Sequence, residues 1–332
     1  MAPATLTRLK MSSKMIDVSI VIVCMNNWDN ISRCLDSIRK HTSVSYEVLV
    51  VAYLFSVSNL ERLRKEYPWI TIIVNNEIKG FSENNNLALR QARGRYCFVL
   101  NDDTELTMPA IDRLVRDIDS LPDDIAIISP VLLNPDGSVQ VCGRPPMNWR
   151  TFILHRLHLW NERSRTKYVN QNGIFQSYNI IGAAFLIRTD LFRQYGWFDE
   201  RYFFTPEDIA LSTRLNRAGY KCIVDADASL IHFGGMSGLS PSMIQSATIP
   251  SGIKGTLEFF SNNSRSGYFG LALFASGISV MTILFNYYRQ MKNPGSKLYR
   301  PMIAGHRNVI ASLFNSQSPK EIFIKYYRQL KS

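Results

Sequence analysis

The stretch Tyr96-Cys97-Phe98-Val99-Leu100-Asn101-Asp102-Asp103 decides the fold, because it joins an apolar run directly to two adjacent carboxylates. A short apolar run of this kind predicts a buried strand. In an open α/β sheet, ligands bind beyond the carboxyl ends of the strands. The two carboxylates would repel each other there unless a divalent cation bridged them to a diphosphate. The alternative is a surface turn or a helix cap, which Asp and Asn also favour.

The residues before this stretch alternate strand and helix signals. Apolar runs predict strands at 18–24, 47–51, 71–74 and 96–100. Between them, helical spacing of apolar residues starts after Asn27 or Asp29, a capping-box pattern begins at Ser58, and a third helix covers 82–93. This order predicts an α/β fold with a mostly parallel, doubly wound sheet, whose first half binds a nucleotide.

The second half is less regular. A helix is expected at 109–119, and strands at 125–131, 180–188, 221–225 and 229–232. Residues 143–173 are polar and aromatic with poor periodicity, which predicts a mobile loop. Thr205 is a good helix N-cap and Pro206 suits the first helical position. That helix would place Glu207 and Asp208 in its first turn.

Charge is concentrated in the tail. The chain has 332 residues and a net charge of +11, of which residues 289–332 contribute +8. The rest is nearly neutral, which argues against nucleic acid as a partner and favours an anionic lipid surface. Residues 267–288 carry no charged side chain. They could span a bilayer, lie in its interface or form a buried core helix.

Cysteine usage indicates the compartment. The five cysteines show no CxxC pair and no zinc-ligand spacing. They predict buried, reduced thiols in a reducing compartment. Residues 1–14 are polar and basic, so no signal peptide is expected.

Two further segments carry candidate chemistry. An acid at the start of a helix, here Glu207 or Asp208, can project as a general base, although acids in a first turn often only complement the helix dipole. His232 ends a strand before Gly234 and Gly235, where its imidazole could reach a metal or phosphate. A lone histidine of this kind is more often held by a backbone group.

The order of these segments resembles the inverting glycosyltransferases of family 2, which have the A-type fold. The resemblance covers roughly residues 17–240, and the most similar branch is that of bacterial rhamnosyltransferases which build cell-surface polysaccharides. It is carried by Val18–Val23 with Asn26-Asn27, Gly80–Asn86, Leu100–Thr104, Ile181–Arg188 with Gly196–Glu200, Glu207-Asp208 and His232.

The resemblance implies a role for each matching residue. Asp208 would be the general base, with Glu207 as second choice or as a ligand of the acceptor hydroxyl. Mn²⁺ or Mg²⁺ would be held by Asp103 and His232, with Asn101 at most a weak ligand. Donor-binding residues would be Val23, Met25, Asn26, Gly80, Asn84, Asn85 and Asp102. Acceptor-binding residues would be Gly182, Ala183 and Trp197.

The implied activity is inverting sugar transfer from a nucleoside-diphosphate sugar, of the dTDP-rhamnose or UDP-hexose type, to a glycan or lipid-linked acceptor. The catalytic domain would cover 15–245, with a nucleotide-binding half (15–105) and an acceptor half (106–245). A helical, basic, membrane-associating region would follow at 246–332. The protein would lie in the cytoplasm, peripheral on the inner face of the cell membrane.

The chain departs from the family pattern at three places. The run Val51–Phe55 lacks the acid that commonly contacts the nucleobase or ribose, and Met25 replaces a common aromatic residue. Ala210 stands where another acid usually follows the acid pair. These departures leave open a non-catalytic scaffold on the same fold. A nucleotidyltransferase would need a glycine-rich basic loop, which Cys24–Trp28 does not provide.

Overall fold

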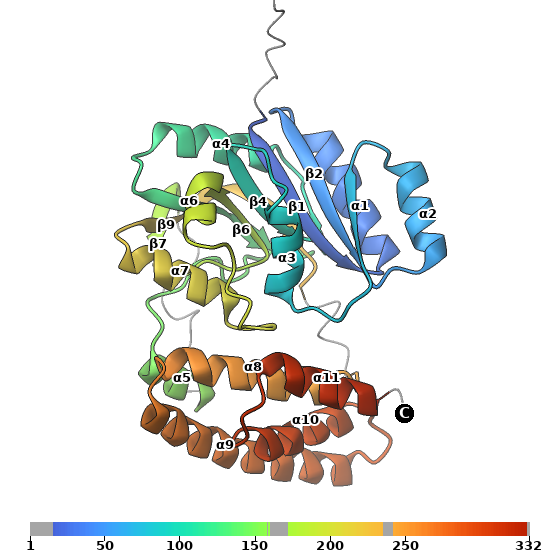
Figure 1. Cartoon of the computed structure of the whole chain (residues 1–332), viewed down its shortest axis with the longest axis vertical. Coiled ribbons are helices and arrows are strands. Elements are labelled where there is room, and N and C mark those ends of the chain that lie inside the picture. Colours follow the sequence, from blue (N-terminus) through green and yellow to red (C-terminus); the bar gives the residue numbers. More distant parts are fainter. Residues whose placement is uncertain (1–15, 158, 160–171, 235–241, 331–332) are drawn as a thin grey trace, which may run out of the picture.

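The computed structural model describes residues 16–157, 159, 172–234 and 242–330. A twisted sheet flanked by helices forms the upper part of Figure 1, and a layer of helices lies beneath it. The described residues form one nine-stranded sheet in the order β3-β2-β1-β4-β8-β6-β9-β5, with β7 paired to β9. Strands β1 to β4 pair in parallel with one another and β6 pairs in parallel with β9, whereas the pairings of β8, β5 and β7 are antiparallel. The predicted fold class is thus confirmed.

The sheet divides into a parallel half and a mixed half. The parallel half consists of β1 (Val18–Met25), β2 (Tyr46–Tyr53), β3 (Thr71–Asn75) and β4 (Tyr96–Asn101). Antiparallel β8 (Ala184–Arg188) joins β4 to the mixed half. That half contains β5 (Thr104–Glu105), β6 (Ile125–Leu133), β7 (Ile174–Ser177) and β9 (Lys221–His232).

Both faces of the sheet are buried, which explains the continuous apolar strands. On β1, Ile20 and Ile22 point into one core cluster and Val21 into the other, because side chains alternate along a strand. Helices α1 (Trp28–His41) and α4 (Ala110–Ser120) contribute to the first cluster. The second includes residues of α3 (Phe81–Leu89), α6 (Thr189–Gln194) and α7 (Glu207–Arg217). All five cysteines are buried and free, as predicted.

The prediction of a mobile loop at 143–173 was wrong in part, because helix α5 (Trp149–Arg156) lies within this range. Asn148 caps this helix by accepting hydrogen bonds from the N–H groups of Arg150 and Thr151. The apolar residues of α5 show little helical periodicity. Local capping and the packing of Phe152 hold the helix in place instead. The part of the predicted loop at 158 and 160–171 lies outside the described residues.

Several predicted boundaries also moved. Ser56, not Ser58, caps α2 (Val57–Glu66), and Pro206, not Thr205, is the N-cap of α7. The Thr205 hydroxyl instead donates to the carbonyl of Gly252 at 3.4 Å. The two strands expected within 221–232 are one strand, β9, because a register shift against β6 absorbs the polar residues between them.

The lower layer consists of α8 (Gln245–Phe260), α9 (Arg265–Lys292), α10 (Tyr299–Ser312) and α11 (Pro319–Gln329), together with α5 (Figure 1). It attaches to the sheet part through Phe323, whose ring lies 4.8 Å from that of Phe203. Lys320 adds an ion pair with Glu83 at the start of α3 (2.6 Å). The predicted domain boundary at 245/246 coincides with the start of α8 and stays a prediction.

Helix α9 is the one helix in the described residues that is long and apolar enough to cross a membrane. Only 22% of its most apolar window is buried inside the protein. This low burial disfavours the core-helix alternative, since the core helix of a soluble protein is mostly buried.

Candidate functional site

The end of β4 brings Asp103 next to His232. Thr104 pairs with His232 across the antiparallel β5 and β9, and the N–H of Phe233 donates to the carbonyl of Asp103 at 2.9 Å. The Asp103 Oδ1 and His232 Nε2 atoms therefore lie 3.3 Å apart, with both side chains largely buried. Residues 129 positions apart in sequence, predicted as metal ligands, are thus adjacent in space.

Gln140 determines which nitrogen of His232 faces Asp103. The Gln140 Nε2 group donates to the His232 carbonyl at 2.7 Å and to Asn134 Oδ1 at 2.8 Å. Because both partners only accept, the Gln140 Oε1 atom is left to accept from His232 Nδ1 (2.9 Å). In the neutral imidazole, Nε2 then carries a lone pair directed at Asp103.

Two electron-rich atoms facing each other fit a bound cation. The Asp103 Oδ1 atom is buried and accepts no hydrogen bond from any residue that the structure describes. A divalent metal ion between it and His232 Nε2 would satisfy both, since imidazole nitrogen and carboxylate oxygen are common ligands of Mn²⁺. Among the described residues, no group of three His, Cys, Asp or Glu side chains is arranged for a metal. The remaining ligands would therefore come from elsewhere, for example from a diphosphate.

Asp102 occupies a different environment from its neighbour. Burial raises the pKa of its carboxyl to about 6, opposed by a hydrogen bond from the Cys24 thiol and reinforced by the charge of Asp103. Cys24 belongs to β1, so Asp102 lies over the end of the first strand, where a donor nucleotide was predicted. Asn101 joins the neighbouring strand through its N–H, which donates to the carbonyl of Ala183 (2.8 Å).

The predicted donor loop is held tightly by the protein itself. Gly80 packs so closely on the backbone of Phe203 that an added Cβ would overlap its carbonyl oxygen. The Asn84 amide donates to the carbonyls of Lys79 and Gly80 and accepts from Asn75 Nδ2 at 2.7 Å. Asn84 therefore shapes the loop, whereas the buried Oδ1 atom of Asn85 has no hydrogen-bond partner among the described residues.

The other predicted donor residues lie at the end of β1. Met25 is 51% exposed, and Val23 is half-buried. Asn26 adopts a positive φ of 49° and its Oδ1 atom accepts from the N–H of Ser56 and from Asn59 Nδ2. These contacts turn the chain away from the end of β1. The exposed Met25 side chain lies at that strand end.

The acid pair at the start of α7 is asymmetric. The Asp208 Oδ2 atom accepts from Arg144 Nη1 at 3.2 Å and from the N–H of Gly182 at 3.3 Å, which stabilises a carboxylate. Glu207 is buried, and its Oε2 atom has no hydrogen-bond partner in the described part of the chain. Burial, and then the charge of Asp208, raise the pKa of Glu207 well above its usual value. Asp208 is therefore the anionic member of the pair.

Gly182 and Ala183 connect the two acid pairs. Gly182 donates to Asp208, while the next residue, Ala183, accepts from Asn101 beside Asp103. Because β8 lies next to β4 in the sheet, the residues before β8 link the predicted base, Asp208, to the strand end that carries the predicted metal ligand Asp103. The third predicted acceptor residue, Trp197, is buried in the core with its ring 5.2 Å from that of Phe192.

Two partners that organise this site, Gln140 and Arg144, were missed by sequence reasoning. Each acts on a residue that is distant in the chain, His232 and Asp208 respectively. Neither belongs to a motif with a characteristic spacing, and both follow β6 in an irregular region.

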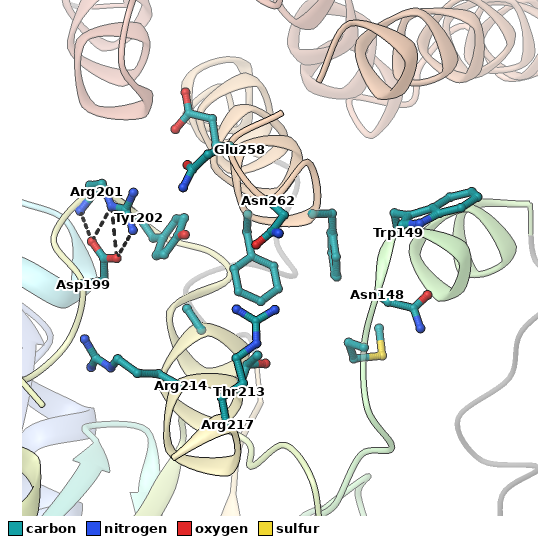
Figure 2. Close-up of a pocket in the computed structure, with 15 residues that line it drawn as sticks. Asn148, Trp149, Asp199, Arg201, Tyr202, Thr213, Arg214, Arg217, Glu258 and Asn262 are labelled. Carbon is teal, nitrogen blue, oxygen red and sulfur yellow. Dashed lines mark hydrogen bonds and ion pairs between the residues drawn. The ribbon is translucent and has the colours of Figure 1, made fainter. Parts of the chain in front are cut away.

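A cavity of about 650 Å³ opens beside the acid pair. Glu207 and Asp208 form part of one wall, and residues of α5, α8 and α10 form much of the remainder. A second cavity of about 440 Å³ lies further along α7 (Figure 2). There Arg214 and Arg217 project from α7, Trp149 lies on α5, and Arg201 is paired with Asp199 at 2.7 Å.

Comparison with known proteins decides the family. The family model described as glycosyl transferase family 2 matches residues 19–196, which is more than half of the chain. The chain belongs to this family. The match includes the predicted donor loop and metal motif but ends before Glu207, Asp208 and His232. The roles of all these residues stay predictions.

Curated relatives place the chain near rhamnosyltransferases within family 2. It is 26% identical over 220 residues to an O-antigen biosynthesis protein, RfbC, from Myxococcus xanthus, covering 65% of this chain and 17% of that protein. It is 29% identical over 143 residues to an N-acetylglucosaminyl-diphospho-decaprenol L-rhamnosyltransferase from Mycobacterium tuberculosis, covering 41% of this chain and 46% of that one. The chain thus spans less than half of either relative.

Solved structures confirm the A-type fold. GalNAc-T7 with UDP, GalNAc and Mn²⁺ superposes with a TM-score of 0.54 at 19% identity, over 70% of this chain and 47% of that one. The mannosyltransferase PcManGT from Pyrobaculum calidifontis, in complex with GDP-Man and Mn²⁺, gives a TM-score of 0.50 at 13% identity. That match covers 92% of this chain and 89% of the archaeal one, so it extends into the helical layer.

Proposed function

We propose that this protein is an inverting, metal-dependent glycosyltransferase that moves a sugar from a nucleoside-diphosphate donor to a hydroxyl of a glycan or lipid-linked acceptor in cell-envelope polysaccharide synthesis. The link from Asp208 through Gly182 and Ala183 to Asn101 and Asp103 is the observation that carries the proposal. It supports a carboxylate base on the same side of the sheet as the proposed cation position, as direct displacement at an anomeric carbon requires.

In the proposed reaction, the acceptor hydroxyl gives its proton to Asp208 while its oxygen attacks the anomeric carbon of the donor sugar. The diphosphate leaves from the opposite face, so a single displacement inverts that carbon. Arg144 and the N–H of Gly182 hold Asp208 in place and anionic until it accepts the proton. Glu207, whose pKa burial raises well above its usual value, is suited to donate a hydrogen bond to an acceptor hydroxyl.

Asp103 and His232 are the residues proposed to hold Mn²⁺ or Mg²⁺. The bound ion would neutralise charge on the leaving diphosphate. Both solved neighbours contain Mn²⁺ together with a nucleotide or nucleotide sugar, which supports this choice. Asp102, Met25 and Val23 lie at the strand ends where the donor would rest. The relative's name supports a dTDP-rhamnose-type donor, with UDP-hexoses as the alternative.

Donor binding tests this function directly. Isothermal titration calorimetry with dTDP-rhamnose, UDP-hexoses and GDP-mannose should give binding for at least one donor in the presence of Mn²⁺. The Asp103→Asn variant should lose the metal-dependent part of that binding. Asp117→Asn, which alters a carboxylate paired with Arg113 away from the site, serves as the matched control. No binding of any donor would instead favour a non-catalytic scaffold.

We also propose that α9 lies in the plane of the membrane interface on the cytoplasmic face. Its side chains Phe269, Leu273, Met281, Leu284 and Phe285 are each more than half exposed. Exposed Arg289, Lys292, Lys297 and Arg300 follow at one end, as suits anionic headgroups.

Packing of α9 on α10 supports an in-plane rather than a spanning orientation. Tyr268 donates to the carbonyl of Leu313 (2.7 Å), and Ser279 and Tyr287 contact His306 and Arg307. Because these contacts run along most of α9, a span would carry the charged α10 into hydrocarbon at a large energetic cost.

Flotation with anionic liposomes tests the membrane contact. The double variant Met281→Glu/Leu284→Glu should lose flotation, whereas Val57→Glu, at a 74% exposed apolar position on α2, should not. Equal flotation of the unaltered protein and both variants would place the membrane contact elsewhere.

A further inference from the structure

The cavity beside Glu207 and Asp208 contains a cation that has no counter-charge among the residues that the structure describes. Arg156, at the end of α5, lines this cavity and lies 6.0 Å from the ring of Phe152. In the described part of the chain it has no carboxylate partner. Burial lowers the pKa of its guanidinium. A half-buried unpaired cation is costly unless an anion joins it.

The other titratable groups of the cavity do not supply that anion. Arg144 and Asp208 neutralise each other across 3.2 Å. Burial raises the pKa of Glu207 well above its usual value, which favours the uncharged form of that carboxyl. His306 faces the same space; burial and the charge of Arg156 lower its pKa to about 4, so it too is neutral. Arg156 therefore leaves a net positive charge among these groups.

Most of the remaining wall is apolar. Met147, Phe152, Ile249, Ile253, Phe260 and Met302 line the cavity. Phe152, Ile253 and Phe260 also belong to the hydrophobic cluster that includes Leu271 and Ala275 of α9. The cavity thus connects the acid pair with the helical layer that carries the exposed apolar face of α9.

We propose that this cavity binds a phosphate-bearing lipid, with Arg156 on the phosphate and the apolar wall on the chain, so that the acceptor sugar is a lipid-linked phosphate or diphosphate presented to Asp208. The role of this lipid as the acceptor rests on the proposed function, whereas the binding of the lipid itself does not. Neither Asp103 nor His232 lines the cavity, so the phosphate recognised here is separate from the diphosphate of the donor.

The adjoining cavity of Figure 2 offers a contrast within the same chain. Its Arg201 is paired with Asp199, and Arg214 donates to the carbonyl of Trp197. Arg217 projects into that cavity from an exposed position on α7. Replacing Arg217 removes a cavity arginine without touching Arg156, which makes Arg217→Gln the matched control.

Binding of farnesyl diphosphate to the full chain in EDTA tests the proposal, because EDTA removes any metal-dependent binding of a diphosphate at Asp103. Tryptophan fluorescence should report saturable binding of farnesyl diphosphate, and much weaker binding of farnesol and of inorganic pyrophosphate. Arg156→Gln should weaken binding at least about tenfold, since charge-assisted hydrogen bonds are the strong ones. Arg156→Lys should retain part of the affinity, and Arg217→Gln all of it.

Three results would overturn the proposal. Equal affinity of Arg156→Gln and the unaltered protein, with both folded by circular dichroism, would remove Arg156 from the site. Farnesol binding as tightly as farnesyl diphosphate would leave only an apolar cavity. Pyrophosphate binding as tightly would leave a site for free phosphate. Because no sugar donor is present, failure here is distinguishable from failure of the donor-binding experiment.

Discussion

Two of the protein's pairs of adjacent carboxylates, Asp102-Asp103 and Glu207-Asp208, lie at the candidate site, and in each of them the two acids differ in the same way. Burial raises the pKa of the first acid, to about 6 for Asp102 and well above the usual value for Glu207. The second acid contacts a polar partner from a distant segment, which is His232 for Asp103 and Arg144 for Asp208.

The partners make the two pairs chemically different. Asp103 faces a lone pair on His232, so that site is complete only when a cation lies between them. Asp208 faces a guanidinium and an N–H, so its carboxylate is already stabilised as an anion. The same residue type can therefore serve as a metal ligand or as a base, depending on the group opposite it.

The largest effect is expected from Asp208→Asn. Because an amide cannot accept the proton, transfer should fall by about 10²–10⁴-fold, with donor affinity within about twofold of the unaltered protein. Initial rates with radiolabelled donor, together with calorimetry, measure both quantities. The matched control is Asp199→Asn, which removes a carboxylate that is paired with Arg201 in the adjoining cavity. Retained transfer in Asp208→Asn would move the base role to Glu207.

A smaller effect is expected from Gln140→Leu, which removes the acceptor for His232 Nδ1. The imidazole would lose its fixed orientation, and Mn²⁺ affinity should fall by about 10–100-fold, as for other residues that orient metal ligands. Electron paramagnetic resonance of free Mn²⁺ in the presence of UDP or dTDP measures it. Gln176→Leu, at an exposed position on β7, should leave the affinity unchanged. An unaltered affinity in Gln140→Leu would mean that His232 is held by its backbone alone.

The smallest effect is expected from Glu207→Gln, and it concerns stability. The folded protein holds the Glu207 proton to higher pH than the unfolded chain does, so this group's contribution to stability decreases as pH rises above the unfolded pKa. Glutamine mimics the protonated form and does not titrate. The melting temperature of the variant, relative to that of the unaltered protein, should therefore rise by about 1–3 °C between pH 5 and pH 8. A difference in melting temperature between the two proteins that is the same at both pH values would show that Glu207 is ionised in the folded protein.

The sheet could be predicted from the sequence because both of its faces are buried, which leaves continuous apolar strands such as β1 and β4. The contact between Asp103 and His232 followed from the resemblance, not from spacing. Helix α5 was missed because Phe152 is one of only two of its residues that are buried, the other being Thr151. Gln140, Arg144 and Arg156 were missed because tertiary packing alone brings them to His232, Asp208 and the lipid cavity.

Hydrolysis of nucleotide sugars by the unaltered protein, with Mn²⁺ and with EDTA, tests the two-site account most directly. We predict release of the nucleoside diphosphate from at least one of dTDP-rhamnose, UDP-hexose and GDP-mannose, with loss of activity in EDTA and recovery when Mn²⁺ is restored. Equal hydrolysis with and without metal would contradict the role proposed for Asp103 and His232.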